Sequence, residues 1–543
     1  MTNVLGVHDG HDAGAALIHG REIHAVNEER LSRKKYHRGF PKKSVKEVIR
    51  LSNLKPSDID VIAVAGIYRK KKRLLTLKND LDDLVGDVDI ITVQHHDAHA
   101  AGAYFTSGLK NSIVLTIDAA GDGLSSAVYI GERGNLKKVA ESSYLDSLGD
   151  FYASITEMLG FVPMRHEGKV MALSAYHESK DHHDFKDCID IDGLGFDNPL
   201  EVTGSGSVKE ISERVDFPLN RKKDCSKVLR DDKREHELWE KAVKIAASAQ
   251  EHIEDLLEKL CENIIEDKRI EERFKKNICY SGGVAQNVKA NKIIKERFES
   301  SYVFPHMGDG GLALGAALLT NQNLTDEKVF WDWKPSSKNV YLGPGSTRDR
   351  VKNTLDEYEE IKWDVLEEKA EFVSSLLTDG KIIGLFQGKM EYGPRALGNR
   401  SIIADPSEEK IKERLNSMLG REKFQPFSPT ILKGYQDDYL KDPEPNKFMT
   451  MSFDITEKAE QDLPAAIHID KTCRPQILER KDNPYYYDII KSFESKTGVG
   501  AVLNTSFNLH GEPIVCTPQE AISSFKRISL DALVIEDFFL IKN

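Results

Sequence analysis

Cysteine is scarce in this chain, and long apolar runs are absent. The 543 residues include six cysteines, and no two of them have the Cys-x-x-Cys spacing. Neither a zinc knuckle nor a disulfide framework is therefore expected. No run approaches the ~18 apolar residues that span a bilayer. The N-terminus also reaches charged residues before the apolar region of a signal peptide forms. These absences predict a soluble, cytoplasmic protein with free thiols and no membrane partner.

Positive charge is in the minority. Lys and Arg number 76 against 88 Asp and Glu, which gives a formal net charge of −12 at pH 7. A general electrostatic grip on nucleic acid is therefore disfavoured. Cations nevertheless gather between Arg30 and Arg38 and again between Lys389 and Arg474. This placement predicts pockets for small phosphorylated substrates rather than a nucleic-acid surface.

An arrangement of strands and polar turns occurs twice in the first third of the chain. Apolar strands are predicted at 4–7 and 13–18, on either side of the turn His8–Asp12, and a third strand follows at 22–26. The same layout returns as strands at 112–117, 125–130 and 136–140, with the turn Asp118–Gly123. This repetition predicts an α/β fold with a duplicated actin-like, ribonuclease-H-like domain whose turns face each other across a nucleotide cleft. Two ordinary hairpins are the alternative.

The later part of the chain divides at a polar stretch. An amphipathic helix is predicted at 235–266, followed by a strand at 277–280 and the Gly-rich turn 281–287, which suits a phosphate or ribose or is simply a tight turn. Residues 321–362 are polar and rich in Pro and Gly, so we place the domain boundary there. The expected units are a first domain, 1–345, a linker, 346–364, and a second α/β domain, 365–543, whose last segment is free to pack back on the first. Elements expected in the second domain are a helix near 368–378 and strands at 381–386, 465–469 and 500–503.

Two histidines have the spacing of a metal site. His95 and His99 are four residues apart at the start of a predicted helix, so their imidazoles share a face. Asp118 and Asp309 offer the carboxylates that complete a site for iron, manganese or zinc. The alternative is that both histidines are polar side chains on the protein surface and bind no metal. A zinc-protease motif is excluded, because the residue after His95 is His96 rather than Glu.

The second domain contains the densest group of cations. Gly and Pro interrupt Arg and Lys in the runs 387–401 and 421–427, and Arg474 and the polar segment 504–508 follow predicted strands. Arg binds phosphate and carboxylate through two parallel hydrogen bonds, and Lys supplies compact charge. We interpret these segments as an anion pocket, with a solvated charged face as the alternative.

The ordered set of motifs resembles the NodU/CmcH-type O-carbamoyltransferases over nearly the whole chain. Its most specific element is the run Gly393-Pro394-Arg395-Ala396-Leu397-Gly398-Asn399-Arg400-Ser401. The other motifs are His11-Asp12-x-x-Ala-Ala, Glu28-Glu29-Arg30-Leu31-Ser32-Arg33-Lys34, His95-His96-Asp97-Ala98-His99-Ala100, Glu167-Gly168-Lys169-Val170-Met171, Gly282-Gly283-Val284-Ala285-Gln286-Asn287, Gly308-Asp309-Gly310-Gly311, Phe424-x-Pro426-Phe427 and Asn504-Thr505-Ser506-Phe507-Asn508.

The resemblance implies an enzyme with an actin-like first domain and a YrdC-like second domain. Such an enzyme converts carbamoyl phosphate to carbamate, joins carbamate to ATP as carbamoyl-adenylate, and passes the carbamoyl group to a hydroxyl of a small acceptor. The implied cofactors are a divalent metal, with iron favoured over manganese or zinc, and magnesium for ATP. The implied metal ligands are His95, His99, Asp118 and Asp309. The implied catalytic residues are His11, a base for the acceptor hydroxyl, with Asp12, Lys34 and Arg395. Carbamoyl phosphate and ATP are assigned to Lys389, Arg395, Asn399, Arg400, Lys423, Arg474, Asn504 and Ser506, and the nucleotide to Gly282, Gly283, Asn287, Gly308 and Gly310.

Two positions depart from the family pattern. His166 stands where an acidic residue is expected, and Gln425 stands where Arg often separates Phe from Pro. These changes affect one anion contact rather than the reaction class. Two other functions stay open at this point: a fused enzyme that forms threonylcarbamoyladenosine in tRNA, and a non-enzymatic actin-like nucleotide-binding regulator.

Overall fold

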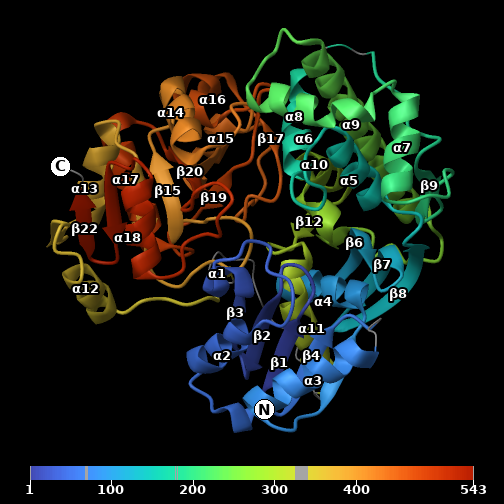
Figure 1. Ribbon diagram of the computed structural model, residues 1–543, viewed down its shortest axis with the longest axis horizontal. Coiled ribbons are helices and arrows are strands. Elements are labelled where there is room, and N and C mark those ends of the chain that lie inside the picture. The colour runs from blue at the N-terminus through green and yellow to red at the C-terminus, as the bar shows by residue number, and fades with distance from the viewer. Residues whose placement is uncertain (1, 68–70, 178, 180, 325–339, 542–543) are drawn as a thin grey trace.

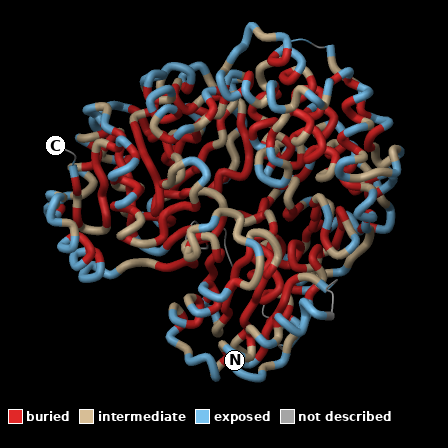
Figure 2. Tube along the Cα trace, in the orientation of Figure 1, coloured by how far each residue is buried: buried red, intermediate tan, exposed pale blue. Residues whose placement is uncertain are grey.

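The computed structural model describes every residue except 1, 68–70, 178, 180, 325–339 and 542–543. The described chain forms three lobes, coloured blue, green and orange to red in chain order (Figure 1). Each lobe is built around its own sheet. Figure 2 shows that the chain is buried inside each lobe and exposed on the outer loops. In the part of the chain that is described, no helix has both the length and the apolar character needed to cross a membrane.

The first lobe contains a five-stranded sheet in the order β3-β2-β1-β4-β5. Its strands are β1 (Val4–His8), β2 (Gly14–His19), β3 (Glu22–Asn27), β4 (Val61–Ala65) and β5 (Ile90–Val93), and its helices are α1 (Glu28–Ser32), α2 (Lys42–Leu51), α3 (Lys71–Val85), α4 (His95–Ser107) and α11 (Leu312–Leu324). The helices α2 and α3 cover one face through residues such as Val48 and Leu81. Alanines of α4 and α11 cover the other face. Because both faces are covered, β1 is buried along its whole length.

The second lobe repeats the connectivity of the first. Its sheet has the order β12-β11-β6-β7-β8, formed by β6 (Asn111–Gly121), β7 (Leu124–Glu132), β8 (Asn135–Ser143), β11 (Asn277–Ser281) and β12 (Ser300–Val303). In both sheets the first three strands pair antiparallel and the last two add in parallel. The duplicated α/β domain predicted from the repeated turns is therefore confirmed.

One detail of the second repeat differs from the prediction. The segment expected as the turn Asp118–Gly123 is strand as far as Gly121. The pairing of β6 with β7 shifts register between Ile117 and Gly121. An irregularity of this kind redirects side chains at the end of a sheet. Asp118 lies at this irregularity.

Helices cover the second sheet and connect it to the third lobe. They are α5 (Leu148–Met158), α6 (Glu167–Leu173), α7 (Ser205–Arg214), α8 (Lys222–Arg230), α9 (Glu237–Glu266) and α10 (Val288–Arg297). The long amphipathic helix predicted at 235–266 is confirmed as α9, which begins after His236, whose ring nitrogen accepts a hydrogen bond from Leu238 N. Its apolar face is buried in the core that contains α5 and α6.

The third lobe contains an eight-stranded mixed sheet in the order β13-β22-β21-β14-β15-β20-β16-β19. These strands are β13 (Trp363–Val365), β14 (Ile383–Phe386), β15 (Arg400–Ala404), β16 (Ser428–Leu432), β19 (Gln476–Leu478), β20 (Ala501–Ser506), β21 (Ala532–Ile535) and β22 (Phe538–Ile541). The helices are α12 (Arg348–Asp356), α13 (Lys369–Thr378), α14 (Glu409–Leu419), α15 (Gln436–Tyr439), α16 (Glu457–Asp462), α17 (Pro484–Thr497) and α18 (Pro518–Arg527). The predicted helix near 368–378 and the strand at 381–386 are present as α13 and β14.

Three expectations for this lobe need correction. The strand predicted at 465–469 is instead a 3₁₀ turn at Pro464–Ala466 followed by irregular chain, because Pro464 favours the start of a helical turn. The polar segment 504–506 lies inside β20 rather than after it. The stretch expected as a linker, 346–364, contains α12, whose Val351 and Leu355 are buried, and the start of β13. Part of the predicted polar boundary, 325–339, lies outside the described residues.

Gly315 allows α11 to lie directly on α4. A Cβ at this position would be 1.9 Å from the carbonyl oxygen of Ala98, between His95 and His99. We expect Gly315→Ala to lower the free energy of unfolding by about 2 kcal/mol, because a close-packed contact cannot take an extra methyl group. Urea unfolding measures this. The control is Gly434→Ala, since a Cβ there meets no atom within 4 Å. Equal effects of the two substitutions would contradict the close contact between the helices.

Candidate active site between the lobes

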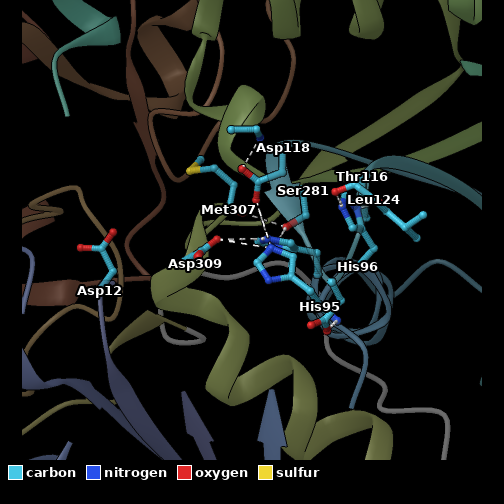
Figure 3. Close-up of polar contacts among 12 residues, drawn as sticks. Asp12, His95, His96, Thr116, Asp118, Leu124, Ser281, Met307 and Asp309 are labelled. Carbon is cyan, nitrogen blue, oxygen red and sulfur yellow. Dashed lines mark hydrogen bonds and ion pairs between the residues drawn. The ribbon is translucent and has the colours of Figure 1, made fainter. Parts of the chain in front are cut away.

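Four side chains from three segments converge where the two repeats of the first domain meet. His95 and His99 lie one turn apart on α4, Asp118 lies near the end of β6, and Asp309 begins the short 3₁₀ helix η5 (Asp309–Gly311) before α11. The Nε2 atoms of His95 and His99 are 3.3 and 3.0 Å from Asp118 Oδ2, and both are 3.5 Å from Asp309 Oδ1. Figure 3 shows the carboxylates of Asp118 and Asp309 converging on the imidazole rings. The sequence predicted this set, and the structure brings it together.

Burial and charge make this set suitable for a divalent metal. All four side chains are less than a tenth exposed, and one ligand atom from each lies within 4.8 Å of the others. Burial alone would raise the pKa of Asp309, but His95, His11 and His99 hold it at about 2. The pKa of Asp118 is likewise well below its usual value, because its hydrogen bonds to His95 and His99 outweigh burial. Two imidazoles and two charged carboxylates are the donors that iron, manganese and zinc accept.

The ligand helix is held by contacts behind it. Asp122 Oδ2 accepts the backbone N–H of His95 at 2.8 Å, and Gln94 caps α4 by accepting from Asp97 N. The hydroxyl of Ser281 lies 3.4 Å from His99 Nδ1 and donates to Met307 O. Such contacts fix the orientation of a ligand imidazole before a metal binds.

His11 and Asp12 lie beside this cluster, in the turn between β1 and β2. His11 Nε2 is 3.1 Å from Asp309 Oδ2, and its Nδ1 is 3.2 Å from Asp12 Oδ2. Asp309 first and then Asp12 raise the pKa of His11 to about 9. The imidazole is therefore protonated at neutral pH as long as no bound cation neutralises the Asp309 carboxylate. This imidazole can accept a proton near neutral pH only when the charge of that carboxylate is neutralised, for instance by a bound cation.

A cavity of about 790 Å³ connects this cluster to the third lobe. His11, Asp118 and Asp309 line one end of it. Three arginines line the other: Arg395, Arg421 and Arg474. A pocket formed between domains, with a few convergent polar groups, is typical of an active site.

The three arginines have no carboxylate partner among the described residues. Arg474 donates from Nε and a terminal nitrogen to Ser428 Oγ, at 3.1 and 2.9 Å. Arg421 donates to Thr505 Oγ1 at 3.1 Å and to Gln425 Oε1 at 3.2 Å. Burial and then Arg421 lower the pKa of Arg395 to about 10, and burial, Arg395 and Arg421 hold the pKa of Arg474 well below its usual value. Mutual repulsion of half-buried cations is relieved by a bound anion, so this cluster suits a phosphate or carboxylate.

Two family models match the chain. Residues 3–79 and 64–318 match the N-terminus of carbamoyltransferases, and residues 374–542 match their C-terminus. This chain belongs to the carbamoyltransferase family. The enzyme class expected from the motifs is confirmed, and the non-enzymatic regulator is set aside.

The relatives of this carbamoyltransferase include proteins of nearly the same length. Protein MJ1051 of Methanocaldococcus jannaschii is 39% identical over 99% of each chain. Nodulation protein NolNO of Sinorhizobium fredii is 31% identical over 98% of this chain and 79% of its own length. Among solved structures, full-length HypF in its phosphate- and nucleotide-bound form is 16% identical with a TM-score of 0.38, over 60% of this chain and 47% of that one. That likeness is too distant to inform the site.

Three lysines predicted to belong to the site of this carbamoyltransferase lie outside the cavity. The side chains of Lys34, Lys389 and Lys423 are exposed and do not line it. Lys35 lines the cavity instead of Lys34, because Arg33 has a left-handed backbone (φ 60°) that turns the chain after α1. Arg421 takes the place of Lys423, directly after Gly420, which ends α14 with φ 66°. The sequence run contained both Arg421 and Lys423, and spacing did not distinguish them.

Asn399, Arg400 and Asn504 support the cavity wall from behind. Arg400 is fully buried and donates to the carbonyls of Gln387, Asn399, Pro344 and Gly388. Asn399 donates to Lys389 O, and Asn504 donates to Ala396 O. These contacts hold the loop that presents Arg395, so we correct their predicted role from ligands to supports. Arg395, Arg474 and Ser506 do line the cavity.

The glycine-rich turns divide in the same way. Gly283, Asn287, Gly308 and Gly310 line the cavity, and Gly282 does not. Gly282 has φ 103°, and a Cβ there would be 2.1 Å from Ile117 O. The backbone conformation and the close contact therefore both require glycine at this position. The amide of Asn287 is already bonded to Gln250, and its Oδ1 caps α10.

Proposed function

We propose that this carbamoyltransferase uses ATP and carbamoyl phosphate to make carbamoyl-adenylate and transfers the carbamoyl group to a hydroxyl of a small acceptor. The observation that carries the proposal is that Asp118 and Asp309 of the His/Asp cluster line the same cavity as the three arginines. Phosphate handling and carbamoyl transfer then occur at opposite ends of a single enclosed space. The proposed division of labour is transfer by residues 1–345 and carbamoyl phosphate chemistry by residues 365–543.

The arginine end suits the phosphorylated substrates. Water and carbamoyl phosphate give carbamate and phosphate, with the P–O–C link broken. Carbamate oxygen then attacks the α-phosphorus of ATP, which gives carbamoyl-adenylate and releases pyrophosphate. Arg395, Arg421 and Arg474 bind the phosphoryl and carboxylate charges in these steps, and magnesium accompanies ATP. Backbone at Gly283, Gly308 and Gly310 lies toward the other end, where we place the adenylate.

The His/Asp end suits transfer to the acceptor. His95, His99, Asp118 and Asp309 would hold a divalent metal, with iron favoured, which supplies Lewis-acid polarisation of an oxygen when bound. His11, held by Asp12, takes the proton of the acceptor hydroxyl as the oxygen attacks the carbamoyl carbon. The products are the carbamate ester of the acceptor and AMP. The enclosing lobes exclude water, which otherwise hydrolyses the adenylate.

The test follows pyrophosphate. Metal-loaded protein is incubated with ATP and carbamoyl phosphate, and products are analysed by mass spectrometry and a pyrophosphate assay. We expect pyrophosphate and carbamoyl-adenylate to form only when both substrates are present. Turnover that depends on threonine and bicarbonate instead would favour the tRNA-modifying fusion enzyme. Absence of pyrophosphate in every case would reject the proposal.

A further inference from the structure

A buried ion pair joins the second lobe to the third at the edge of the arginine cluster. Lys169 lies on α6, in the Glu167–Met171 motif, and its Nζ is 2.5 Å from Oε1 of Glu422. Both side chains are less than a tenth exposed. Lys169 lines the cavity, and Glu422 follows Arg421 directly in the chain. The proposed steps above assign neither residue a role.

Glu422 adjoins Arg421 of the arginine cluster in the chain, and the carboxylates of Glu29, Glu167 and Glu512 line the same cavity. Arg421 feels the charge of Glu422, and Arg421 in turn lowers the pKa values of Arg395 and Arg474. Lys169 occupies Oε1 of Glu422, whereas Oε2 is buried without a hydrogen-bond partner. A buried carboxylate is strongly destabilised unless a cation neutralises it. Besides Lys169, the basic groups that feel the charge of Glu422 are Arg421 of the arginine cluster, His166 and His510.

Other titratable groups around the pair are mainly cationic. Lys35, His166 and His510 all feel the charge of Lys169. Burial is the main reason that the pKa values of these three groups are lowered, and Lys169 contributes to each. The position of the Glu422 carboxylate therefore affects how strongly the basic side chains around the cavity attract an anionic substrate.

We propose that Lys169 is a positioning residue that keeps Glu422 away from the arginines, so that their guanidinium groups stay available to a phosphorylated substrate. The inference rests on the proposed function, in which this cluster binds the phosphate of carbamoyl phosphate. Lys169 acts through Glu422 and not by contact with the anion. When Lys169 loses its charge, Glu422 competes with the substrate as an internal anion.

A double-mutant cycle separates this role from an ordinary structural ion pair. Inorganic phosphate is the probe, and its Kd is measured by calorimetry for wild type, Lys169→Met, Glu422→Gln and the double variant. We expect Lys169→Met to weaken phosphate binding by about tenfold or more. We expect the double variant to bind within about threefold of wild type, because the competing carboxylate is gone. KM for carbamoyl phosphate should follow the same order while kcat changes less.

Three further variants keep the test decisive. Lys169→Gln keeps a hydrogen-bond donor if Lys169→Met does not fold, and Lys169→Arg is expected to restore binding. Lys222→Met breaks a more exposed pair with Glu157 outside the cavity and should leave phosphate binding unchanged. A double variant as weak as Lys169→Met would overturn the inference. If both Lys169→Met and Arg474→Met leave phosphate binding intact, the inference and the proposed function are both rejected. If Lys169→Met leaves binding intact but Arg474→Met weakens it, only the inference is rejected.

Discussion

Asp309→Asn is expected to abolish metal retention and to reduce carbamoyl transfer by about 100-fold or more, since even the outer partners of metal ligands are worth ~10–100-fold in affinity or activity. The substitution keeps the shape of the side chain and removes one of the two charges that face His95 and His99. Metal content after purification is measured by mass spectrometry, and transfer by the mass of the carbamoylated acceptor.

Asp309 also contacts His11, so a second variant is needed to isolate the metal effect. His99→Gln removes a ligand for which the structure gives no contact with His11, and it should lose the metal equally. The control is Asp97→Asn on the same helix, where the side chain is half-buried and accepts from Tyr129 OH, a bond that Asn retains. Stoichiometric metal in Asp309→Asn would reject the assigned ligand set.

The duplicated domain was predictable because its pattern is local. Each repeat has a polar turn between two apolar strands, and β1 and β2 read directly from Val4–Val7 and Ala13–Ile18. The metal set followed from the same logic, since turns of duplicated sheets face each other and a helical spacing of four places His95 beside His99. Asp118 needed one further feature, the register shift in β6, that no residue pattern announces.

The third lobe was less predictable because its contacts are distant in sequence. β16 pairs with β20 and β19 across intervening segments, and Pro464 starts a 3₁₀ turn in the apolar stretch that was interpreted as a strand. Around the cavity, the lining residues lie in the loops that the sequence indicated, but in two cases a neighbouring cation lines it instead of the predicted lysine. Whether Lys34 or Lys35 faces the cavity is decided by the left-handed Arg33, and spacing along the chain does not encode that turn.

Arg474→Met is expected to reduce the formation of pyrophosphate from ATP and carbamoyl phosphate by about 100-fold or more, because two charge-assisted hydrogen bonds to an anion contribute ~3 kcal/mol or more. Arg474 is held toward the cavity by Ser428 and has no carboxylate to neutralise it among the described residues. Removing it also takes away a cation that Arg395 and Arg421 repel, so the fold should not be weakened. A thermal unfolding midpoint at or above that of wild type checks this.

The matched control for Arg474 is Lys423→Met, together with Lys389→Met. Both lysines were expected from the sequence to bind carbamoyl phosphate, and both are exposed outside the cavity. Their loss should change pyrophosphate formation by about twofold or less, as is usual for screened surface charges. Arg421→Met, two residues from Lys423, should instead behave like Arg474→Met. If Lys423→Met were as severe as Arg421→Met, the cavity assignment would be wrong and the arginine cluster would not be the site of phosphate binding.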